Sequence, residues 1–259
     1  MSDTLALYER NESAAIITIN RADKRNALSR GLIDALSAVF ARAQNDEAAR
    51  CVILKASGSV FCAGMDLAEL QESLNIPQDQ TPIWDDALRL AKLYDLIYTL
   101  KKPTIAAVQG AAVAGGAGLV TVCDLAVAAP EAKFGYPEVR RGLVAAMVMP
   151  HLLRHVGERM GRYLLLSGEL IGAEEAVRCG MINEAVAADQ LLERALAIAK
   201  ACADGGPNAL AKTKEHLHQF SRQAVSIEDA AKSSAAPRLT DECQQGLRAF
   251  FEKKAAPWV

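Results

Sequence analysis

Three short, strongly apolar segments set the limits on how this chain can fold. They are CVILKA (51–56), TIAAV (104–108) and LAVAA (125–129), and each is short enough for a buried strand. A helical pattern over residues 84–100 separates the first two, and Pro103 stops it. Alternation of buried strands with helices predicts a sheet of parallel type with crossover connections, and therefore an α/β fold.

The regions on either side extend this organisation. Residues 5–8 and 15–19 predict an N-terminal hairpin, whereas residues 75–81, rich in Gln, Asp and Pro, predict a mobile surface segment. From Pro150 onward the pattern is almost entirely helical. Asp189 is the expected cap of one of these helices, and Pro207 is expected to open the next.

Composition narrows the class of protein. Of the 259 residues, 51% are hydrophobic and 23% charged, which excludes long disordered regions. The net charge of −2 gives no electrostatic footprint for nucleic acid or an anionic membrane. Charged residues interrupt the N-terminus, and the six cysteines are scattered without a C-x-x-C pair. We therefore expect a cytoplasmic protein with reduced cysteines that binds neither nucleic acid nor membranes.

Several common functional motifs are absent from the sequence. His151 and His155 lie four apart, but the intervening glutamate of a zinc protease is missing, so we expect no metal site. Neither a P-loop, nor a dinucleotide-binding glycine pattern, nor a G-x-S-x-G nucleophile motif occurs. Residues 103–123 carry no charge, yet their high content of alanine and glycine favours a buried strand, loop and helix over a membrane span.

Two glycine-containing turns remain, and each follows a predicted buried strand. They are FCAGMDL (61–67) and AVAGGAGLV (112–120). Glycine lets a backbone approach a ligand closely and leaves amides exposed, especially where a helix begins. Amides from two such loops could stabilise one oxyanion. The same glycines could equally serve tight turns and close helix packing, so their spacing leaves both interpretations open.

At these residues the sequence resembles the crotonase, or enoyl-CoA hydratase/isomerase, superfamily. The resemblance covers nearly the whole chain and includes NALSRGLIDAL, VFCAGMDLAEL, KPTIAAVQGAAVAGGAGLVTVCDLAVAA, AKFGYPEVRRGL, SGELIGAEEAVRCGMINEAV and AFFEKKAAPW. It implies a β-β-α spiral core that binds acyl-CoA, assigned to residues 1–195. It also implies a helical C-terminal region, residues 196–259, that packs subunits into a homotrimer or hexamer.

The resemblance also implies a site. The thioester oxygen of an acyl-CoA would be held by the backbone amides of Met65 and Gly115, and Glu138 would be the acid–base group. Coenzyme A would be part of the substrate, so no separate cofactor is expected. Ala63 and nearby backbone would face the adenine, with basic side chains near the phosphates. The residues assigned to substrate and coenzyme A binding are Lys24, Arg25, Ala63, Gly64, Asp66, Leu67, Gly116, Gly118, Tyr136 and Lys253. Tyr136 either lines the acyl slot or simply packs.

One departure from the family pattern bears on the reaction. Hydratases of this family generally use two glutamates; the second corresponds to Glu138, whereas the first falls on Gly118. The favoured function is still an enoyl-CoA hydratase, a lyase of fatty acid metabolism. A Δ3,Δ2-enoyl-CoA isomerase with Glu138 as proton shuttle is the alternative, and a catalytically silent CoA- or nucleic-acid-binding member is a third.

The glycine at position 118 also suggests an acyl preference. The volume that a glutamate would occupy must hold water, a neighbouring side chain or more substrate. We therefore expect a preference for bulkier or carboxylated acyl groups over crotonyl-CoA, which Gly118→Glu would narrow.

Overall fold

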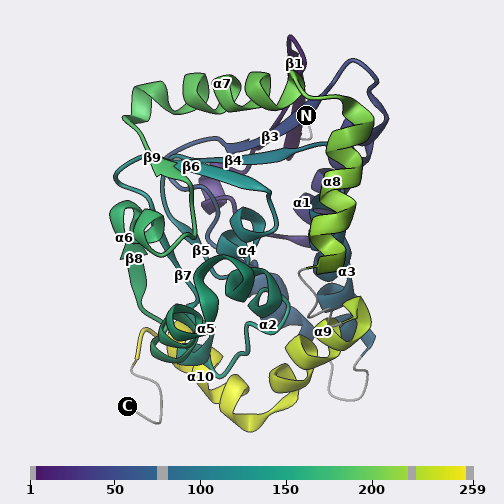
Figure 1. Ribbon diagram of the computed structural model, residues 1–259. Coiled ribbons are helices and arrows are strands. Elements are labelled where there is room, and N and C mark those ends of the chain that lie inside the picture. Colours follow the sequence, from purple (N-terminus) through teal and green to yellow (C-terminus); the bar gives the residue numbers. More distant parts are fainter. Residues whose placement is uncertain (1–3, 75–80, 221–225, 255–259) are drawn as a thin grey trace.

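The computed structural model describes residues 4–74, 81–220 and 226–254 (Figure 1). The predicted mobile segment 75–81 lies outside the described residues except for its last residue, Thr81, which begins a helix. Among the described residues, no helix combines the length and apolar character needed to cross a membrane.

A mixed sheet forms the centre of the molecule. In the described residues its strands follow the order β1 (Ala6–Asn11), β2 (Ala14–Ile19), β3 (Cys51–Ala56), β4 (Thr104–Val108), β6 (Leu125–Ala128) and β9 (Glu184–Ala185). The β1–β2 pair is an antiparallel hairpin, and all later neighbours are parallel. The predicted hairpin, the three buried strands and the parallel sheet are therefore confirmed.

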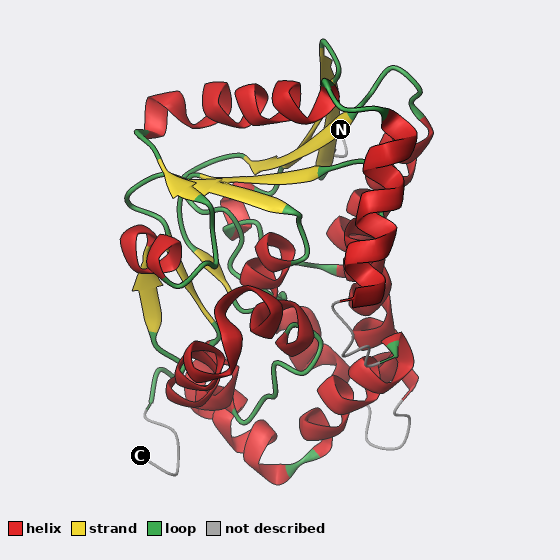
Figure 2. Ribbon diagram, viewed as in Figure 1, coloured by secondary structure: helices red, strands yellow, loops and turns green. Residues whose placement is uncertain are grey.

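A second, smaller sheet lies beside the first (Figure 2). It consists of β5 (Ala112–Val113), β7 (Lys133–Gly135) and β8 (Leu170–Gly172), in the order β5-β7-β8. The sequence did not predict these strands, because two or three residues are too few to show an alternating pattern. Their pairing places Val113 beside Gly135, so the second glycine turn runs next to the segment that leads to Glu138.

Helices surround both sheets. The α-helices are α1 (Arg30–Asn45), α2 (Leu67–Leu74), α3 (Thr81–Tyr98), α4 (Gly115–Thr121), α5 (Met149–Ser167), α6 (Ala173–Arg178), α7 (Leu191–Ala203), α8 (Pro207–Phe220), α9 (Ile227–Ala235) and α10 (Asp241–Phe251). The 3-10 helices are η1 (Ala22–Lys24), η2 (Pro137–Arg141), η3 (Ala188–Gln190) and η4 (Ala236–Leu239). Pro207 opens α8 as predicted. The predicted Asp189 cap is wrong: Asp189 lies in η3, and Gln190 precedes α7 without a side-chain cap.

The central strands of the main sheet, β2, β3 and β4, are covered on both faces, which explains why they are almost entirely apolar and buried. Helix α7 lies across one face (Figure 1), where its Leu191, Ala195 and Ala199 pack against Ile53 and Ile105. The opposite face packs against the larger core, to which α1, α3 and α4 contribute. The predicted division after residue 195 falls inside α7, so this helix continues the α/β core past that point.

Candidate functional site

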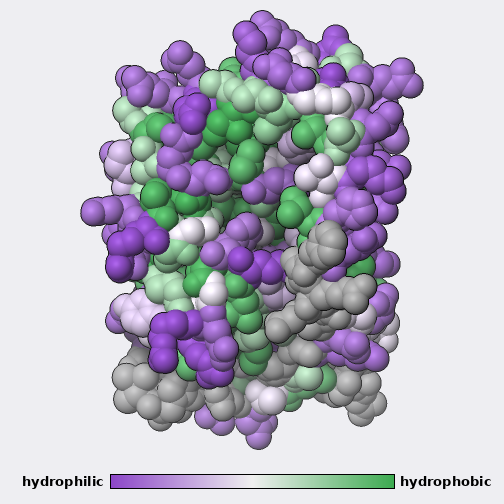
Figure 3. Space-filling model, in the orientation of Figure 1, coloured by the Kyte–Doolittle hydropathy of each residue, from purple (hydrophilic) through white to green (hydrophobic). Residues whose placement is uncertain are grey.

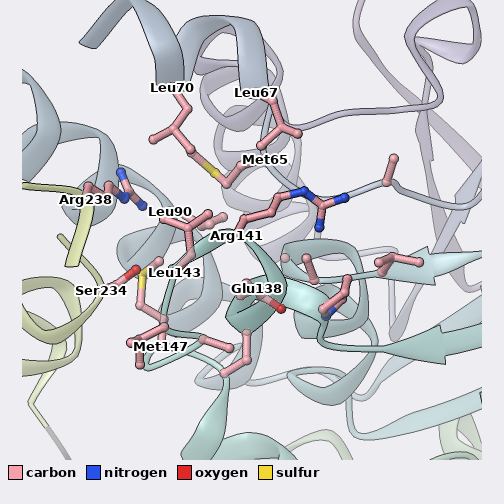
Figure 4. Close-up of a pocket in the computed structure, with 18 of the residues that line it drawn as sticks. Met65, Leu67, Leu70, Leu90, Glu138, Arg141, Leu143, Met147, Ser234 and Arg238 are labelled. Atoms are coloured by element: carbon pink, nitrogen blue, oxygen red, sulfur yellow. The ribbon is translucent and has the colours of Figure 1, made fainter. Parts of the chain in front are cut away.

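A cavity of about 330 Å³ lies where the glycine turns, η2 and the C-terminal helices meet (Figure 4). Among the predicted site residues, those that line it are Arg25, Ala63, Met65, Leu67, Gly115 and Glu138. The remaining predicted residues, all within the described part of the chain, are not among its lining residues: Lys24, Gly64, Asp66, Gly116, Gly118, Tyr136 and Lys253. Tyr136 is fully buried and packs in the core, and Asp66 pairs with Arg21 at 2.6 Å.

The two glycine turns lie directly against each other. The Cys62 amide donates to the Ala111 carbonyl at 3.1 Å, and the Val113 amide donates to the Cys62 carbonyl at 2.9 Å. Gly64 has a φ of +90°, and a Cβ there would lie 2.9 Å from the Ala114 Cβ. Glycine is therefore required at position 64, both for its backbone conformation and for the close approach of the second turn.

The amides of Met65 and Gly115 stand outside the surrounding backbone pairing. Leu28 donates to the Gly64 carbonyl at 2.8 Å and accepts from the Asp66 amide at 3.0 Å, so this bridge does not use the Met65 amide between them. Gly115 begins α4, and the first amide of a helix has no acceptor within the helix. Both residues line the cavity. Two residues of adjoining loops, whose amides the surrounding backbone bonds do not use, thus line the cavity.

The backbone before Gly115 is held in an uncommon conformation. Ala114 has φ 54° and ψ −125°, a region that residues with a side chain rarely adopt. Its amide donates to the Gly135 carbonyl at 2.8 Å. Tyr94 Oη donates to the Gly115 carbonyl at 2.7 Å from the other side. These bonds fix the direction of the first amides of α4.

The space beside Gly118 is filled by neighbouring side chains. A Cβ at position 118 would lie 2.5 Å from Val148 Cγ1 and 2.6 Å from Tyr94 Oη. Tyr94 is fully enclosed in the core, where burial raises the pKa of its hydroxyl well above its usual value. Of the three possible occupants of this volume, the structure shows neighbouring side chains, because α3 supplies Tyr94 to it.

Glu138 lies in the first turn of η2, and its carboxyl group faces the cavity (Figure 4). Its Oε2 is buried and has no hydrogen-bond partner among the described residues. Burial raises the pKa of this carboxyl to about 7, against the opposing attraction of the Arg141 guanidinium. A carboxyl group with this pKa can both take up and release a proton near neutral pH.

The remaining polar wall comes from residues that the sequence analysis did not single out. They are Tyr94 from α3, Arg141 from η2, Ser234 from α9 and Arg238 from η4. The Arg141 guanidinium lies 4.5 Å from the centre of the Phe250 ring, which joins η2 to α10. Periodicity could not find these residues, since a tyrosine on an apolar helix face usually belongs to the core. Arg238 did carry a signal, as a single charge within AAPRL.

The histidines considered as metal ligands are used elsewhere. His155 Nε2 is 2.9 Å from the Thr121 carbonyl, and His151 Nδ1 is 3.2 Å from Arg154. In residues 4–74, 81–220 and 226–254, no group of three or more ligating side chains could hold a metal ion.

Comparison with known proteins shows to which family this chain belongs. A model of the enoyl-CoA hydratase/isomerase family matches residues 9–259. A protein of Thermus thermophilus, provisionally named an enoyl-CoA hydratase, is 39% identical over 93% of this chain and 95% of its own length. The mevalonyl-coenzyme A hydratase of Aspergillus fumigatus is 33% identical over 94% of this chain and 90% of its own.

The fold agrees with solved structures. The crystal structure of an enoyl-CoA hydratase from Mycobacterium avium superposes with a TM-score of 0.84 and 31% identity, covering 99% of this chain and 100% of that one. The chain therefore belongs to the enoyl-CoA hydratase/isomerase family and is an enzyme of that family. The predicted crotonase-type α/β fold is confirmed, with helices at its C-terminal end.

Proposed function

We propose that this protein is an enoyl-CoA hydratase in which the Met65 and Gly115 amides form an oxyanion hole and Glu138 is the only acid–base residue. The observation that carries the proposal is the arrangement of the cavity. It combines two unengaged amides from adjoining loops with one buried carboxyl group whose pKa is about 7. The names of the relatives, which are hydratases, support the same reaction.

The chemistry follows from these groups. Ionised Glu138 takes a proton from water as the water oxygen bonds to Cβ of the 2-enoyl thioester. The electrons of the double bond move toward the thioester oxygen, where the two amides stabilise the enolate. Protonated Glu138 then returns a proton to Cα, and the carboxylate is regenerated. A fixed amide donor of this kind typically contributes roughly 3 kcal/mol to lowering the barrier.

An isomerase is the second candidate, and one observation favours it. Glu138 is the only carboxylate among the residues that line the cavity in the described chain. Moving a proton from Cα to Cγ needs one such group, whereas hydratases of this type generally use two. A catalytically silent member, the third interpretation, would bind acyl-CoA without converting it.

Incubation with 2-enoyl- and 3-enoyl-CoA esters in deuterated water distinguishes a hydratase, an isomerase and a catalytically silent protein. A hydratase yields 3-hydroxyacyl-CoA, heavier by one molecule of heavy water, from the 2-enoyl ester. An isomerase interconverts the two enoyl esters with deuterium exchange and without a change in oxygen content. Binding of both esters with no product would exclude enzymatic turnover of enoyl-CoA.

Gly64→Ala is expected to lower kcat by at least about 100-fold, because a displaced oxyanion donor costs 10²–10³ in rate. The added Cβ meets the Ala114 Cβ at 2.9 Å and the Val113 carbonyl oxygen at 3.0 Å, and the φ of +90° disfavours alanine. The two loops must then separate. Steady-state kinetics on a 2-enoyl-CoA would show the loss. Gly206→Ala, where the nearest atom is 3.8 Å from the added Cβ, is the matched control and should retain full rate.

The dependence of kcat/KM on pH should reflect the ionisation of Glu138. Its raised pKa means that the carboxylate needed as base is scarce below pH 7 and abundant above it. We expect kcat/KM to rise tenfold per pH unit below about pH 7 and to level off above it, until other groups titrate. A profile that is flat between pH 5 and pH 8 would contradict this role.

Self-association into a trimer or hexamer, in the cytoplasm, is part of the same proposal. Large apolar side chains are exposed on α5, β8 and α6, namely Tyr163, Leu166, Leu170 and Val177. Figure 3 also shows apolar residues gathered over the upper half of one face, where α7 and the sheet lie. A second copy of the chain would cover such surfaces. Sedimentation of the purified protein should give three or six times the chain mass of 27.7 kDa, and a stable monomer would contradict the assembly.

A further inference from the structure

The cavity wall contains an arginine, one of whose guanidinium nitrogens has no hydrogen-bond partner among the described residues. Arg238, in η4, lines the cavity with only 4% of its surface exposed, and its Nη1 is buried with no hydrogen-bond partner among the described residues. A buried guanidinium without a partner is costly, because it has lost hydration and gained no anion. Burial accordingly lowers the pKa of Arg238.

The acid whose charge reaches Arg238 is already committed to other groups. Asp86 Oδ1 accepts from Arg30 Nε at 2.6 Å, and its Oδ2 accepts from Arg30 Nη2 at 2.7 Å and from Ser73 Oγ at 3.0 Å. Among the described residues, no ion pair joins Asp86 to Arg238. Within the described part of the chain, the Arg238 Nη1 donor is therefore open to an acceptor that enters the cavity.

The position of Arg238 in the cavity indicates which part of a bound substrate would reach it. In Figure 4, Arg238 and Ser234 lie on one side of the cavity, with Leu90 and Leu143 between them and Glu138. Arg141 extends to the opposite side of the same view. Arg25, which the sequence assigned to coenzyme A, also lines the cavity. An acyl group that starts at Glu138 and crosses the apolar section between Leu90 and Leu143 would bring its far end to Arg238.

We propose that Arg238 binds a carboxylate at the far end of the acyl group, so that the preferred substrates are 2-enoyl-CoA thioesters of dicarboxylic acids. The inference rests on the proposed function for the identity of the thioester. A carboxylate matches the planar donors of a guanidinium, and Ser234, 6% exposed on the same wall, offers a further hydroxyl donor. The preference arises from this charge and not from space at Gly118, which Tyr94 occupies.

The test compares acyl groups of equal length with and without the terminal charge. We would measure kcat/KM for the five- and six-carbon 2-enoyl-CoA esters that end in a carboxylate, and for the matching esters that end in a methyl group. The wild-type ratio of carboxylate to methyl should exceed one. Arg238→Met should lower it by about 100-fold, the usual cost of removing one partner of a buried charge pair. Arg238→Lys keeps the positive charge but loses the planar pair of guanidinium donors, so its ratio should lie between those of wild type and Arg238→Met.

Two further measurements distinguish loss of carboxylate binding from a folding defect of the variant or from a lack of enzymatic activity. Arg248→Met removes an exposed arginine of α10 and should leave the ratio unchanged. Binding of saturated adipyl-CoA to wild-type protein, compared with the ester whose terminal carboxylate is an amide, needs neither turnover nor a variant. Weaker binding of the amide ester would support a binding site for the terminal carboxylate, whether or not any ester is hydrated. If no ester is hydrated, the proposed hydratase function is wrong but the carboxylate-binding site still stands. Equal binding of both, or a ratio that Arg238→Met does not change, overturns the inference.

Discussion

Glu138→Gln is expected to lower kcat by about 1,000-fold while changing the affinity for CoA esters by no more than a few fold. The amide has nearly the same shape as the carboxyl group but cannot exchange a proton, and positioned acid–base groups typically contribute 10²–10⁴-fold. No other carboxylate lines the cavity in the described chain, so no neighbour can take over the role. Single-turnover kinetics and binding of a saturated acyl-CoA to the same variant would check both parts.

The stability of the Glu138→Gln variant at different pH values tests whether the pKa of Glu138 is raised in the folded protein. The pKa of Glu138 is raised from 4.5 to about 7 in the folded protein, so folding favours the protonated carboxyl group. The wild-type protein therefore loses stability as the pH rises from about 4.5 through 7, and glutamine removes that loss. Glu138→Gln should melt at a higher temperature than wild type at pH 8 and at a similar temperature near pH 4. Lower stability at both pH values would contradict the raised pKa of Glu138, and near-wild-type turnover would remove Glu138 from the mechanism.

Gly118→Glu is expected to destabilise the protein and not to restore a hydratase with two glutamates. Its Cβ would meet Val148 Cγ1 at 2.5 Å and Tyr94 Oη at 2.6 Å, so these buried side chains would have to shift to admit it. Overpacking of this kind costs about 1–3 kcal/mol, and burial of an unpaired carboxylate adds to it. We expect a loss of roughly 3 kcal/mol or more, and a melting temperature lower by about 6–12 °C.

Gly172→Ala is the matched control for this substitution. No atom lies within 4 Å of a Cβ at position 172, so its melting temperature should stay within a degree or two of wild type. If Gly118→Glu folded with wild-type stability and hydrated crotonyl-CoA faster, Tyr94 and Val148 would have to be able to move aside. The packing described around α4 would then be wrong.

Much of the fold could be predicted because its strands are buried on both faces. Residues 51–56 and 104–108 are almost entirely apolar, and the structure places β3 and β4 at those positions. The small sheet could not be predicted, since strands such as β5 contain too few residues for any period to appear. The start of α7 was also misjudged, because a short 3-10 turn occupies the position where a side-chain cap was expected.

The candidate site was predictable where the backbone itself is unusual. The glycines of both turns suggested two loops whose amides could act at one site, and the hydrogen bonds between Cys62 and residues 111–113 show that these loops adjoin. The roles given to Met65, Gly115 and Glu138 stay predictions. Tyr94 and Arg238 could not be assigned from sequence, because only the tertiary structure reveals that one fills the space beside Gly118 and that the other lines the cavity.

The cavity is assembled from several segments that are far apart in sequence. The paired turns and Glu138 come from residues before 142, whereas Ser234, Arg238 and Phe250 belong to the C-terminal helices. On the roles proposed for Glu138 and Arg238, the acid–base group and the group that selects the acyl chain are encoded in separate parts of the gene. Exchange of the segment from α9 to α10 between relatives would produce enzymes that share one chemistry and accept different acyl groups. Such a division gives natural recombination, as well as protein engineering, a simple way to create new members of the family.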